Sequence, residues 1–367
     1  MTTTTRPLRA PGSPLGVGFL GAGPVTQAIH LPTLAQMPEL FRVVRVMDVD
    51  ADVAASVAAR VGADSTTDMT ALLADPRVDV VAICSPHVFH AEHVIAACRA
   101  GVAAVLCEKP FAMTGEEATA IAAVSAETGV PILVGAMHAY DAGWLAAAAA
   151  GVVPHTIRSS IVLPLNARFE DAATEILSRP DPAPFDAGDS EQTAAAVAGG
   201  VMGLAVHDLP LVRELLGRVS PSAWSTAQVV SAEFLAPFGY LVVLTAGDVL
   251  VELHAVMGSA SEPDWRLTAI GTDDAGDDLI AEVRFTPSYV QAGSATAEII
   301  RASGSLLVPP TDRNGYQDEW RHVAELARGA TPLRSTSSLV DDLVFALSIA
   351  EAAADAARSG TFAEAAR

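Results

Sequence analysis

The sequence contains almost no lysine. Lys109 is the only one among 22 basic side chains, and the other 21 are arginine. An ammonium can lose its proton when its pKa is lowered, whereas a guanidinium stays protonated, so a single retained lysine suits acid–base chemistry. The alternative is a surface lysine left over in an arginine-biased sequence. Its neighbours favour the chemical interpretation, because Lys109 follows the apolar run 105–107 and precedes Pro110.

Cysteine, long apolar runs and positive charge are also scarce. Cys84, Cys98 and Cys107 are odd in number and lie in apolar surroundings, which indicates reduced thiols, and their spacing matches no metal site. No apolar run reaches the roughly 18 residues of a membrane span, and residues 1–6 lack the apolar core of a secretion signal, so we expect a soluble, cytoplasmic protein. The net charge of -21 disfavours nucleic-acid and membrane partners.

The length predicts more than one domain. A chain of 367 residues with a hydrophobic fraction of 51% is expected to fold around two cores. We predict a disordered tail over residues 1–13, because it is rich in threonine and proline, then a first domain over 14–137 and a second over 138–367.

The first domain alternates short apolar runs with helical segments. This alternation predicts a parallel sheet covered on both faces, the Rossmann type of α/β fold. The expected strands are 15–20, 43–47, 79–84, 102–107 and 132–134, and the expected helices start near Pro24 or span 51–60, 91–100 and 116–128.

A glycine turn follows the first expected strand. Gly21 and Gly23 allow a tight turn and a close approach of pyrophosphate to a helix amino terminus. Asp48, at the end of the second strand, suits hydrogen bonds to both ribose hydroxyls and would repel a 2′-phosphate, which favours NAD over NADP. Thr26 replaces the third glycine of the fingerprint, and two glycines alone are a weak signal. The candidate contacts here are Gly21, Gly23, Pro24, Val25 and Asp48.

Several motifs further along resemble those of the Gfo/Idh/MocA family, named for glucose-fructose oxidoreductase and inositol dehydrogenase. The resemblance extends over residues 14 to 360 and is strongest over the first 140. The motifs are Ser85-Pro86-His87-Val88-Phe89-His90, Cys107-Glu108-Lys109-Pro110, residues 135–141, Gly199-Gly200, His207-Asp208-Leu209 and Leu215-Leu216-Gly217.

The resemblance implies an NAD(P)-binding domain joined to an α+β domain with an open, mostly antiparallel sheet, and an active site between them. By the same resemblance Lys109 faces the reacting oxygen, Glu108 contacts the nicotinamide ribose and His207 gives or takes a proton. Pro86 packs near the nicotinamide. Ser85 and His90 complete the cofactor contacts implied by these motifs.

Three positions depart from the family pattern. Gly203 stands where many members have an aspartate, Ala205 replaces a glycine and Ala139 replaces an arginine. Losing the aspartate removes a group that would orient His207 and hold a substrate hydroxyl. Asp208 is adjacent, but on a helix it would point about 100° away from His207.

We therefore assign Lys109, His207 and Tyr140 as candidate catalytic residues and His138 and Asp208 as candidate substrate contacts, with no metal. For oxidation of an alcohol, the base removes the hydroxyl proton while hydride leaves carbon. Two structural alternatives remain open. His207 could be a polar residue at a helix start, and His87 and His90 could cap the helix after the fourth strand.

The second domain reads as a meander of strands. Short connections predict an antiparallel sheet, and a helix over 337–357 closes the chain. Between strands, residues 166–185 resemble no regular element and are either a lid over the substrate or a variable loop. In residues 249–256 alternate side chains point to opposite faces of the sheet, and Glu252, His254 and Val256 share one face. This mixed polar and apolar face suits either a homodimer or homotetramer interface through the sheet or exposure to solvent. The expected strands are 156–165, 228–234, 240–245, 250–256, 265–270, 278–285 and 296–308.

The leading hypothesis is an NAD-dependent oxidoreductase acting on a carbonyl or alcohol of a sugar-like or other polar small metabolite. One alternative is a reductase of imines or conjugated carbonyls in a specialised biosynthetic pathway. The other is a non-catalytic NAD-binding protein, which Gly203 and Ala139 favour and the retained Lys109 disfavours. The sequence determines neither the substrate nor the direction of hydride transfer.

Overall fold

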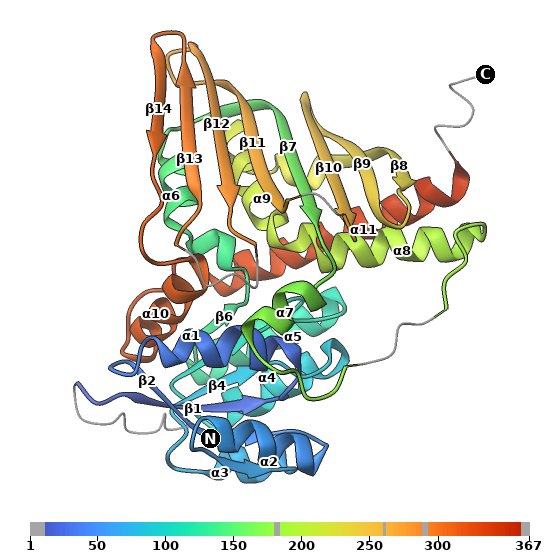
Figure 1. Ribbon diagram of the computed structural model, residues 1–367. Coiled ribbons are helices and arrows are strands. Elements are labelled where there is room, and N and C mark those ends of the chain that lie inside the picture. Colours follow the sequence, from blue (N-terminus) through green and yellow to red (C-terminus); the bar gives the residue numbers. More distant parts are fainter. Residues whose placement is uncertain (1–11, 180–183, 260–261, 288–292, 361–367) are drawn as a thin grey trace. The chain divides into compact units, whose positions relative to one another are not determined.

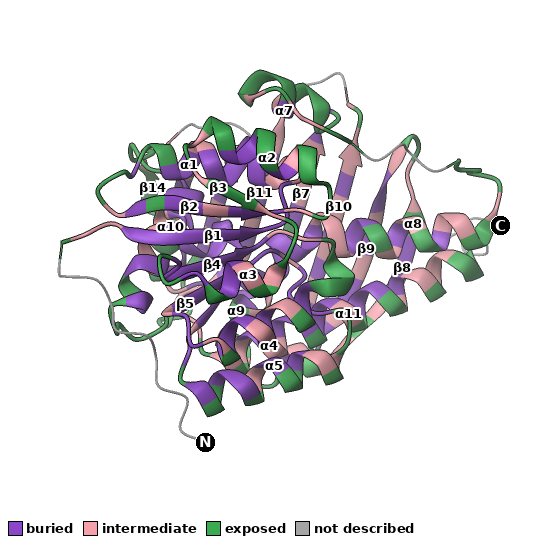
Figure 2. Cartoon of the chain, turned by 90° about the horizontal axis from the view of Figure 1, so that it is seen from below, coloured by how far each residue is buried: buried purple, intermediate pink, exposed green. Residues whose placement is uncertain are grey.

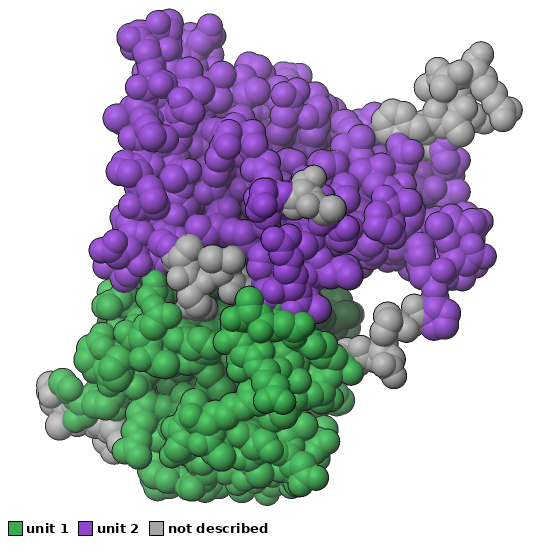
Figure 3. All heavy atoms as spheres, viewed as in Figure 1, with its two compact units in different colours: residues 1–136, 170–181, 316–343 green, residues 137–169, 182–315, 344–367 purple. Residues whose placement is uncertain are grey.

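A computed structural model describes residues 12–179, 184–259, 262–287 and 293–360 (Figure 1). The chain forms two compact units, shown in separate colours in Figure 3, and each is described here by itself. The first unit holds the residues up to Ala136 together with Glu170–Asp181 and Tyr316–Leu343. The second unit holds Met137–Phe169, Pro182–Gly315 and the residues from Val344 onward. Most of the tail predicted over residues 1–13 lies outside the described residues.

The first unit contains a six-stranded parallel sheet. Its strand order, β3-β2-β1-β4-β5-β6, is that of the Rossmann fold that the alternating pattern predicted, although β3 was not among the expected strands. Every residue of β1 and β4 is buried, as Figure 2 shows, because helices cover both faces of such a sheet. The strands are β1 (Leu15–Leu20), β2 (Phe41–Met47), β3 (Asp64–Thr66), β4 (Val80–Ile83), β5 (Ala104–Cys107) and β6 (Ile132–Val134).

Local signals set the helices of this unit. The Asp50 side chain accepts from the backbone N–H groups of Asp52 and Val53 and so caps α2, while Thr114 caps α5 and Gly129 ends it at φ +71°. The helix predicted from Pro24 does begin there. The elements are η1 (Thr26–His30), α1 (Leu31–Ala35), α2 (Ala51–Arg60), α3 (Met69–Ala74), η2 (His87–Phe89), α4 (His90–Arg99), α5 (Gly115–Thr128) and α10 (Gly315–Ala327).

The second unit is built on an eight-stranded sheet with the order β14-β13-β12-β11-β7-β10-β9-β8. Only β7 and β10 pair in parallel, so the expectation of a mostly antiparallel sheet is confirmed. The single strand predicted over 296–308 is wrong, because the chain turns back before Gly304. The strands are β7 (Val153–Leu163), β8 (Ala227–Phe234), β9 (Phe238–Ala246), β10 (Val249–Met257), β11 (Asp264–Thr272), β12 (Asp278–Phe285), β13 (Thr296–Arg301) and β14 (Gly304–Val308).

Helices α6, α8 and α9 pack on this sheet. The alternation read in β10 is confirmed, since Val251, Leu253 and Ala255 are fully buried while the residues between them are partly exposed. The helical elements are η3 (Met137–Tyr140), α6 (Ala142–Ala149), α7 (Ala167–Ala173), α8 (Ser190–Gly203), η4 (Ala205–His207), α9 (Leu209–Val219), η5 (Ala223–Thr226) and α11 (Thr336–Ser359).

None of the described helices is, by itself, both long and apolar enough to cross a membrane. The segments Ser190–His207 and Leu209–Val219 reach the required length only as a pair, and that pair is bent by 71°.

The segment 166–185 differs from its prediction. It begins with a regular helix, α7, although residues 180–183 lie outside the described part. The chain after α7 packs on the first unit's α2 and η1: the Leu177 N–H donates to Gln27 Oε1 at 3.0 Å, and Arg60 Nη1 donates to the Glu175 carbonyl at 2.8 Å. Residues 175–177 are thereby tied to the helix that follows the glycine turn.

Candidate active site

The glycine turn after β1 requires glycine at its first position. Gly21 has φ +100°, and a Cβ there would lie 2.5 Å from the Cys84 carbonyl oxygen and 2.7 Å from the Ser85 nitrogen. This close approach joins the ends of β1 and β4, where the strand order reverses and where such folds bind nucleotides. Thr26, which replaces the third glycine of the fingerprint, donates its hydroxyl to the Gly21 carbonyl at 2.7 Å and holds the turn.

Asp48 ends β2 beside this turn. Its Oδ2 accepts the Ala22 N–H at 2.8 Å and its Oδ1 accepts the Asp50 N–H at 3.1 Å. A Cβ at Gly23 would contact nothing within 4 Å among the described residues, so the backbone is open to a close ligand there. An open glycine turn, a helix start at Pro24 and a carboxylate at the end of β2 together fit a dinucleotide.

Glu108 is the most heavily anchored side chain at the end of β5. Its Oε1 lies 3.0 Å from His30 Nε2, and its Oε2 accepts the Lys109 backbone N–H at 3.2 Å. Burial alone would raise the pKa of Glu108, but the hydrogen bond from His30 and the charge of Lys109 lower it below its ordinary value. Gly135 is needed here because a Cβ would lie 2.9 Å from Glu108 Oε1.

His30 is fully buried and uses both ring nitrogens. The indole N–H of Trp320 donates to its Nδ1 at 3.1 Å, and because an indole can only donate, His30 must carry its proton on Nε2. That Nε2–H then donates to Glu108. The contact between His30 and Trp320 was not predicted, because the two residues lie 290 positions apart and meet only in the folded unit.

A second carboxyl group lies in the same interior. Glu319, on α10, has no exposed surface. Burial raises its pKa well above the ordinary value, and the nearby charge of Glu108 raises it further. Burial thus favours the neutral form of Glu319, whereas the partners of Glu108 favour its ionised form. Sequence reasoning also missed this residue.

Lys109 follows Glu108 and is partly exposed. Burial of its ammonium group lowers the pKa of Lys109, and the attraction of the Glu108 carboxylate only partly opposes this effect. A lysine with a lowered pKa can exchange a proton closer to neutral pH than an ordinary lysine.

His90 connects the loops after β4 and β5. Its Nδ1 lies 2.7 Å from the Pro110 carbonyl oxygen and its Nε2 lies 2.8 Å from the Ser85 carbonyl oxygen. The alternative that His87 and His90 cap a helix is wrong, because neither η2 nor α4 has a side-chain cap. Ser85 Oγ bonds His93 Nδ1 at 2.9 Å. The predicted cofactor residue Pro86 is exposed.

The predicted substrate residues of the second unit form one buried cluster. Asp208 is fully buried and accepts three hydrogen bonds, from Ser159 Oγ at 2.6 Å, Trp265 Nε1 at 2.9 Å and His138 Nδ1 at 2.8 Å. The His138 ring stacks on Phe285 with 3.7 Å between centroids. The donors come from η3, β7 and β11, so this carboxylate fastens a helical turn to two strands.

His207 lies in the same cluster, with its ring centroid 5.9 Å from that of His138 and 5.4 Å from that of Trp265. Tyr140 is buried on η3. A Cβ at Gly203 would meet nothing within 4 Å among the described residues, so space does not account for the missing aspartate. The structure thus brings His138, His207 and Asp208 together, and separately brings Glu108 and Lys109 together.

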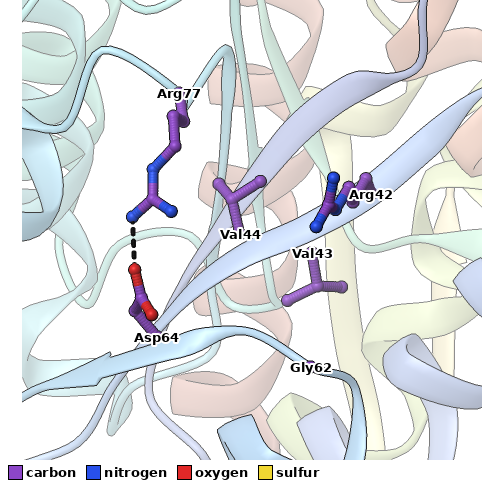
Figure 4. A pocket seen from close by; sticks show the side chains of 6 residues that line it. All are labelled: Arg42, Val43, Val44, Gly62, Asp64 and Arg77. Carbon is purple, nitrogen blue, oxygen red and sulfur yellow. Dashed lines mark hydrogen bonds and ion pairs between the residues drawn. The ribbon is translucent and has the colours of Figure 1, made fainter.

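One hollow lies away from all of these residues. It has a volume of about 140 Å³ on the β2 and β3 side of the first unit (Figure 4). The Arg77 guanidinium in it is already paired with Asp64 at 2.6 Å and Asp75 at 2.7 Å, so it offers little free charge. Among the described residues, no group of three or more His, Cys, Asp or Glu side chains could hold a metal ion. The lining residues are Arg42, Val43, Val44, Gly62, Asp64 and Arg77.

The fold and the glycine turn define the class: a dinucleotide-binding Rossmann unit combined with an antiparallel-sheet unit. Residues 15–136 match the model of an oxidoreductase family with an NAD-binding Rossmann fold. This match, over residues 15–136, is to the Gfo/Idh/MocA oxidoreductase family.

Relatives of known activity match about a third of the chain. Inositol 2-dehydrogenase 3 of Saccharopolyspora erythraea is 40% identical over 129 residues, which are 35% of this chain and 38% of that protein. D-glucoside 3-dehydrogenase of Escherichia coli K12 is 40% identical over 107 residues, 29% of this chain and 30% of the relative. The matches therefore span well under half of each relative.

Solved structures match nearly the whole chain, but at low identity. UDP-N-acetylglucosamine 3-dehydrogenase from Acidithiobacillus ferrooxidans is 22% identical with a TM-score of 0.67, covering 94% of this chain and 99% of that one. A 3-ketoreductase from Actinomadura kijaniata, solved with NADP and TDP-benzene, is 20% identical with a TM-score of 0.65, covering 90% of this chain and 95% of that one. These likenesses establish the fold of both units.

Proposed function

We propose that the protein is an NAD-dependent oxidoreductase that interconverts an alcohol and a carbonyl on a sugar-like or polyol metabolite. The observation that carries this proposal is Lys109, an amine of lowered pKa held at the end of β5 by an ionised, hydrogen-bonded Glu108. The names of the relatives, an inositol and a glucoside dehydrogenase, support the substrate class.

The cofactor assignment rests on the β2 end. Gly21, Gly23 and the helix from Pro24 would hold the pyrophosphate, and Asp48 would accept from the adenosine ribose hydroxyls. Asp48 and the neighbouring Asp50 put two carboxylates where NADP would need a cation, so NAD is the proposed cofactor. When bound, the nicotinamide supplies a hydride acceptor for the substrate carbon.

Lys109 performs the proton chemistry in this proposal. In its neutral form the amine accepts the substrate hydroxyl proton, and in its charged form it stabilises negative charge on that oxygen. Glu108 fixes the Lys109 backbone through the hydrogen bond to its N–H, and His30 in turn fixes Glu108. His207 and Tyr140 are the proposed proton-handling residues of the second unit.

The test is a Lys109→Met variant assayed for NADH formation with inositol, a methyl glucoside and levoglucosan. We expect turnover to fall by about 10²–10⁴-fold with NAD affinity unchanged, because an acid–base group is lost and the dinucleotide contacts are kept. In the wild type, oxidation should increase with pH and level off below the ordinary lysine value of 10.5. Arg99→Met, an exposed change on α4, is the matched control. Near-normal turnover of Lys109→Met would remove Lys109 from the mechanism.

We also propose that the protein forms a homodimer or homotetramer through the sheet face that carries Glu252, His254 and Val256. These residues are only partly exposed and alternate with a fully buried row. Light scattering on the wild type and on a Val256→Glu variant tests this, and a monomeric wild type would contradict it.

A further inference from the structure

The His138–Asp208 pair has a feature that no proposed step yet uses. His138 is 3% exposed, and its Nε2 has no hydrogen-bond partner among the residues that the structure describes. Leaving a buried polar atom without a partner destabilises the folded state. In a native structure such an atom calls for an explanation, and one explanation is that it accepts a proton during the reaction.

The protonation of His138 follows from its partner. Asp208 also accepts from the Ser159 hydroxyl and the Trp265 indole, both of which are donors here, so it is held as an acceptor of three hydrogen bonds. An ionised Asp208 can only accept, so in that state His138 Nδ1 carries a proton and donates it to Asp208 Oδ1. In the neutral ring the remaining nitrogen, Nε2, is then an unprotonated acceptor, the state of a histidine base oriented by a carboxylate.

The ring next to His138 belongs to His207, the second unit's proposed proton-handling residue. Their centroids are 5.9 Å apart, and Trp265 packs edge-on against both rings. Phe285 also stacks on His138, and both histidines are buried. Protonation of His138 would give its ring a positive charge, which the hydrogen-bonded and fully buried Asp208 would stabilise.

We propose that His138 and Asp208 form a proton-relay dyad that serves His207 and takes over the role of the carboxylate absent at Gly203. The proton taken up by His207 passes to His138 Nε2, and the resulting imidazolium is held by Asp208; no bond to carbon changes and no electrons move. In the reducing direction the proton returns by the same route. This inference rests on the proposed function, because a relay requires a substrate proton to move.

Two substitutions at one position separate a relay from a structural contact. In His138→Asn the amide nitrogen takes the place of Nδ1, so it keeps the hydrogen bond to Asp208 and removes the Nε2 acceptor. In His138→Gln the amide nitrogen takes the place of Nε2 and the bond to Asp208 is lost. We expect His138→Asn to retain its melting temperature, NAD affinity and KM while kcat falls about 100-fold. His138→Gln should melt earlier. The control is His155→Asn, an exposed histidine of the same unit, which should resemble the wild type throughout.

Imidazole ¹⁵N NMR provides a readout that needs no turnover. The wild type should show His138 as the neutral ring protonated at Nδ1, and Asp208→Asn should change it to the Nε2-protonated ring, because an amide can donate to Nδ1. A wild-type His138 protonated at Nε2 overturns the dyad.

The kinetic outcomes distinguish the two proposals. If the wild type is active, Lys109→Met is inactive and His138→Asn keeps its kcat, the relay is wrong and the proposed function stands. If the wild type reduces NAD⁺ with none of the three compounds, and reduces no ketone of the same class with NADH, the proposed function fails and the relay fails with it.

Discussion

Each unit contains one buried histidine paired with a buried carboxylate, and the two pairs differ in one respect. His30 bonds Glu108 with one nitrogen and receives the Trp320 indole N–H on the other. His138 bonds Asp208 with one nitrogen, and the other has no partner among the described residues. The first histidine has no nitrogen left for chemistry, whereas the second does.

The two carboxylates differ in the opposite sense, because Asp208 has more side-chain donors than Glu108. Asp208 receives three side-chain donors and holds together η3, β7 and β11. Glu108 receives one side-chain donor and one backbone N–H and lies near Glu319, whose neutral form burial favours. Burial alone therefore does not distinguish a structural histidine–carboxylate pair from a catalytic one. The number of ring nitrogens that have a hydrogen-bond partner does distinguish them.

The largest expected effect is at Asp208. Asp208→Ala leaves three buried donors without an acceptor, and we expect it to lower the free energy of unfolding by about 3–5 kcal/mol. Urea denaturation followed by fluorescence measures this. A loss of less than about 1 kcal/mol would show that Asp208 is not the anchor described here.

His30→Asn should destabilise more than His138→Asn. An asparagine can mimic only one of the two nitrogens that His30 uses, so one hydrogen bond is lost at a cost of about 2 kcal/mol. In His138→Asn the single hydrogen bond is kept, and the stability should change little. Thermal melts of the two variants side by side test the comparison directly, and equal losses would contradict it.

Glu319 should make the protein less stable as the pH rises. Its pKa is raised in the folded state from the ordinary 4.5, so its favourable contribution is complete below pH 4.5 and is lost as the pH rises towards the folded-state value. Glu108, whose pKa is lowered, acts in the opposite direction and loses its contribution as the pH falls. Glu319→Gln should remove a slope of at most about 1.4 kcal/mol per pH unit above pH 4.5, measured by melts across pH. An unchanged slope would mean that Glu319 is ionised in the fold.

The smallest effect is expected at an exposed ion pair of the second unit. Arg158 Nε lies 2.6 Å from Glu252 Oε2 between β7 and β10, but both side chains are solvated. Arg158→Ala should cost less than about 1 kcal/mol. This variant is the reference for the buried pairs. A larger loss of unfolding free energy would indicate that this sheet face is buried in an oligomer.

The sequence predicted the parts of the site that are local. A strand, a glycine turn and a helix start follow one another in residues 15–30, so the role of Gly21 could be inferred from spacing. The Glu108–Lys109 step was recognised from its motif at the end of a strand. Thr26, by contrast, was counted as a missing glycine, and only the structure shows its hydroxyl bonded to the Gly21 carbonyl.

The rest depended on contacts between distant segments. The expectation that Asp208 points about 100° away from His207 assumed one continuous helix. In the structure a short 3-10 turn ends at His207 and α9 starts at Leu209, so Asp208 lies at the junction and bonds residues 70 and 57 positions away. No periodicity within residues 203–219 contains that information. The pairing of His30 with Trp320 is hidden for the same reason.

The return of α10 to the first unit has a practical consequence for protein engineering. A fragment ending near residue 137 would contain every glycine and strand of the nucleotide fold but would lack Trp320 and Glu319. Its His30 would lose the indole donor, and the aromatic contacts of Trp320 with Phe19 and Phe41 would be opened to water. An autonomous version or a chimera of this unit therefore needs residues 316–343 grafted on, since the part that folds together is not a continuous stretch of the chain.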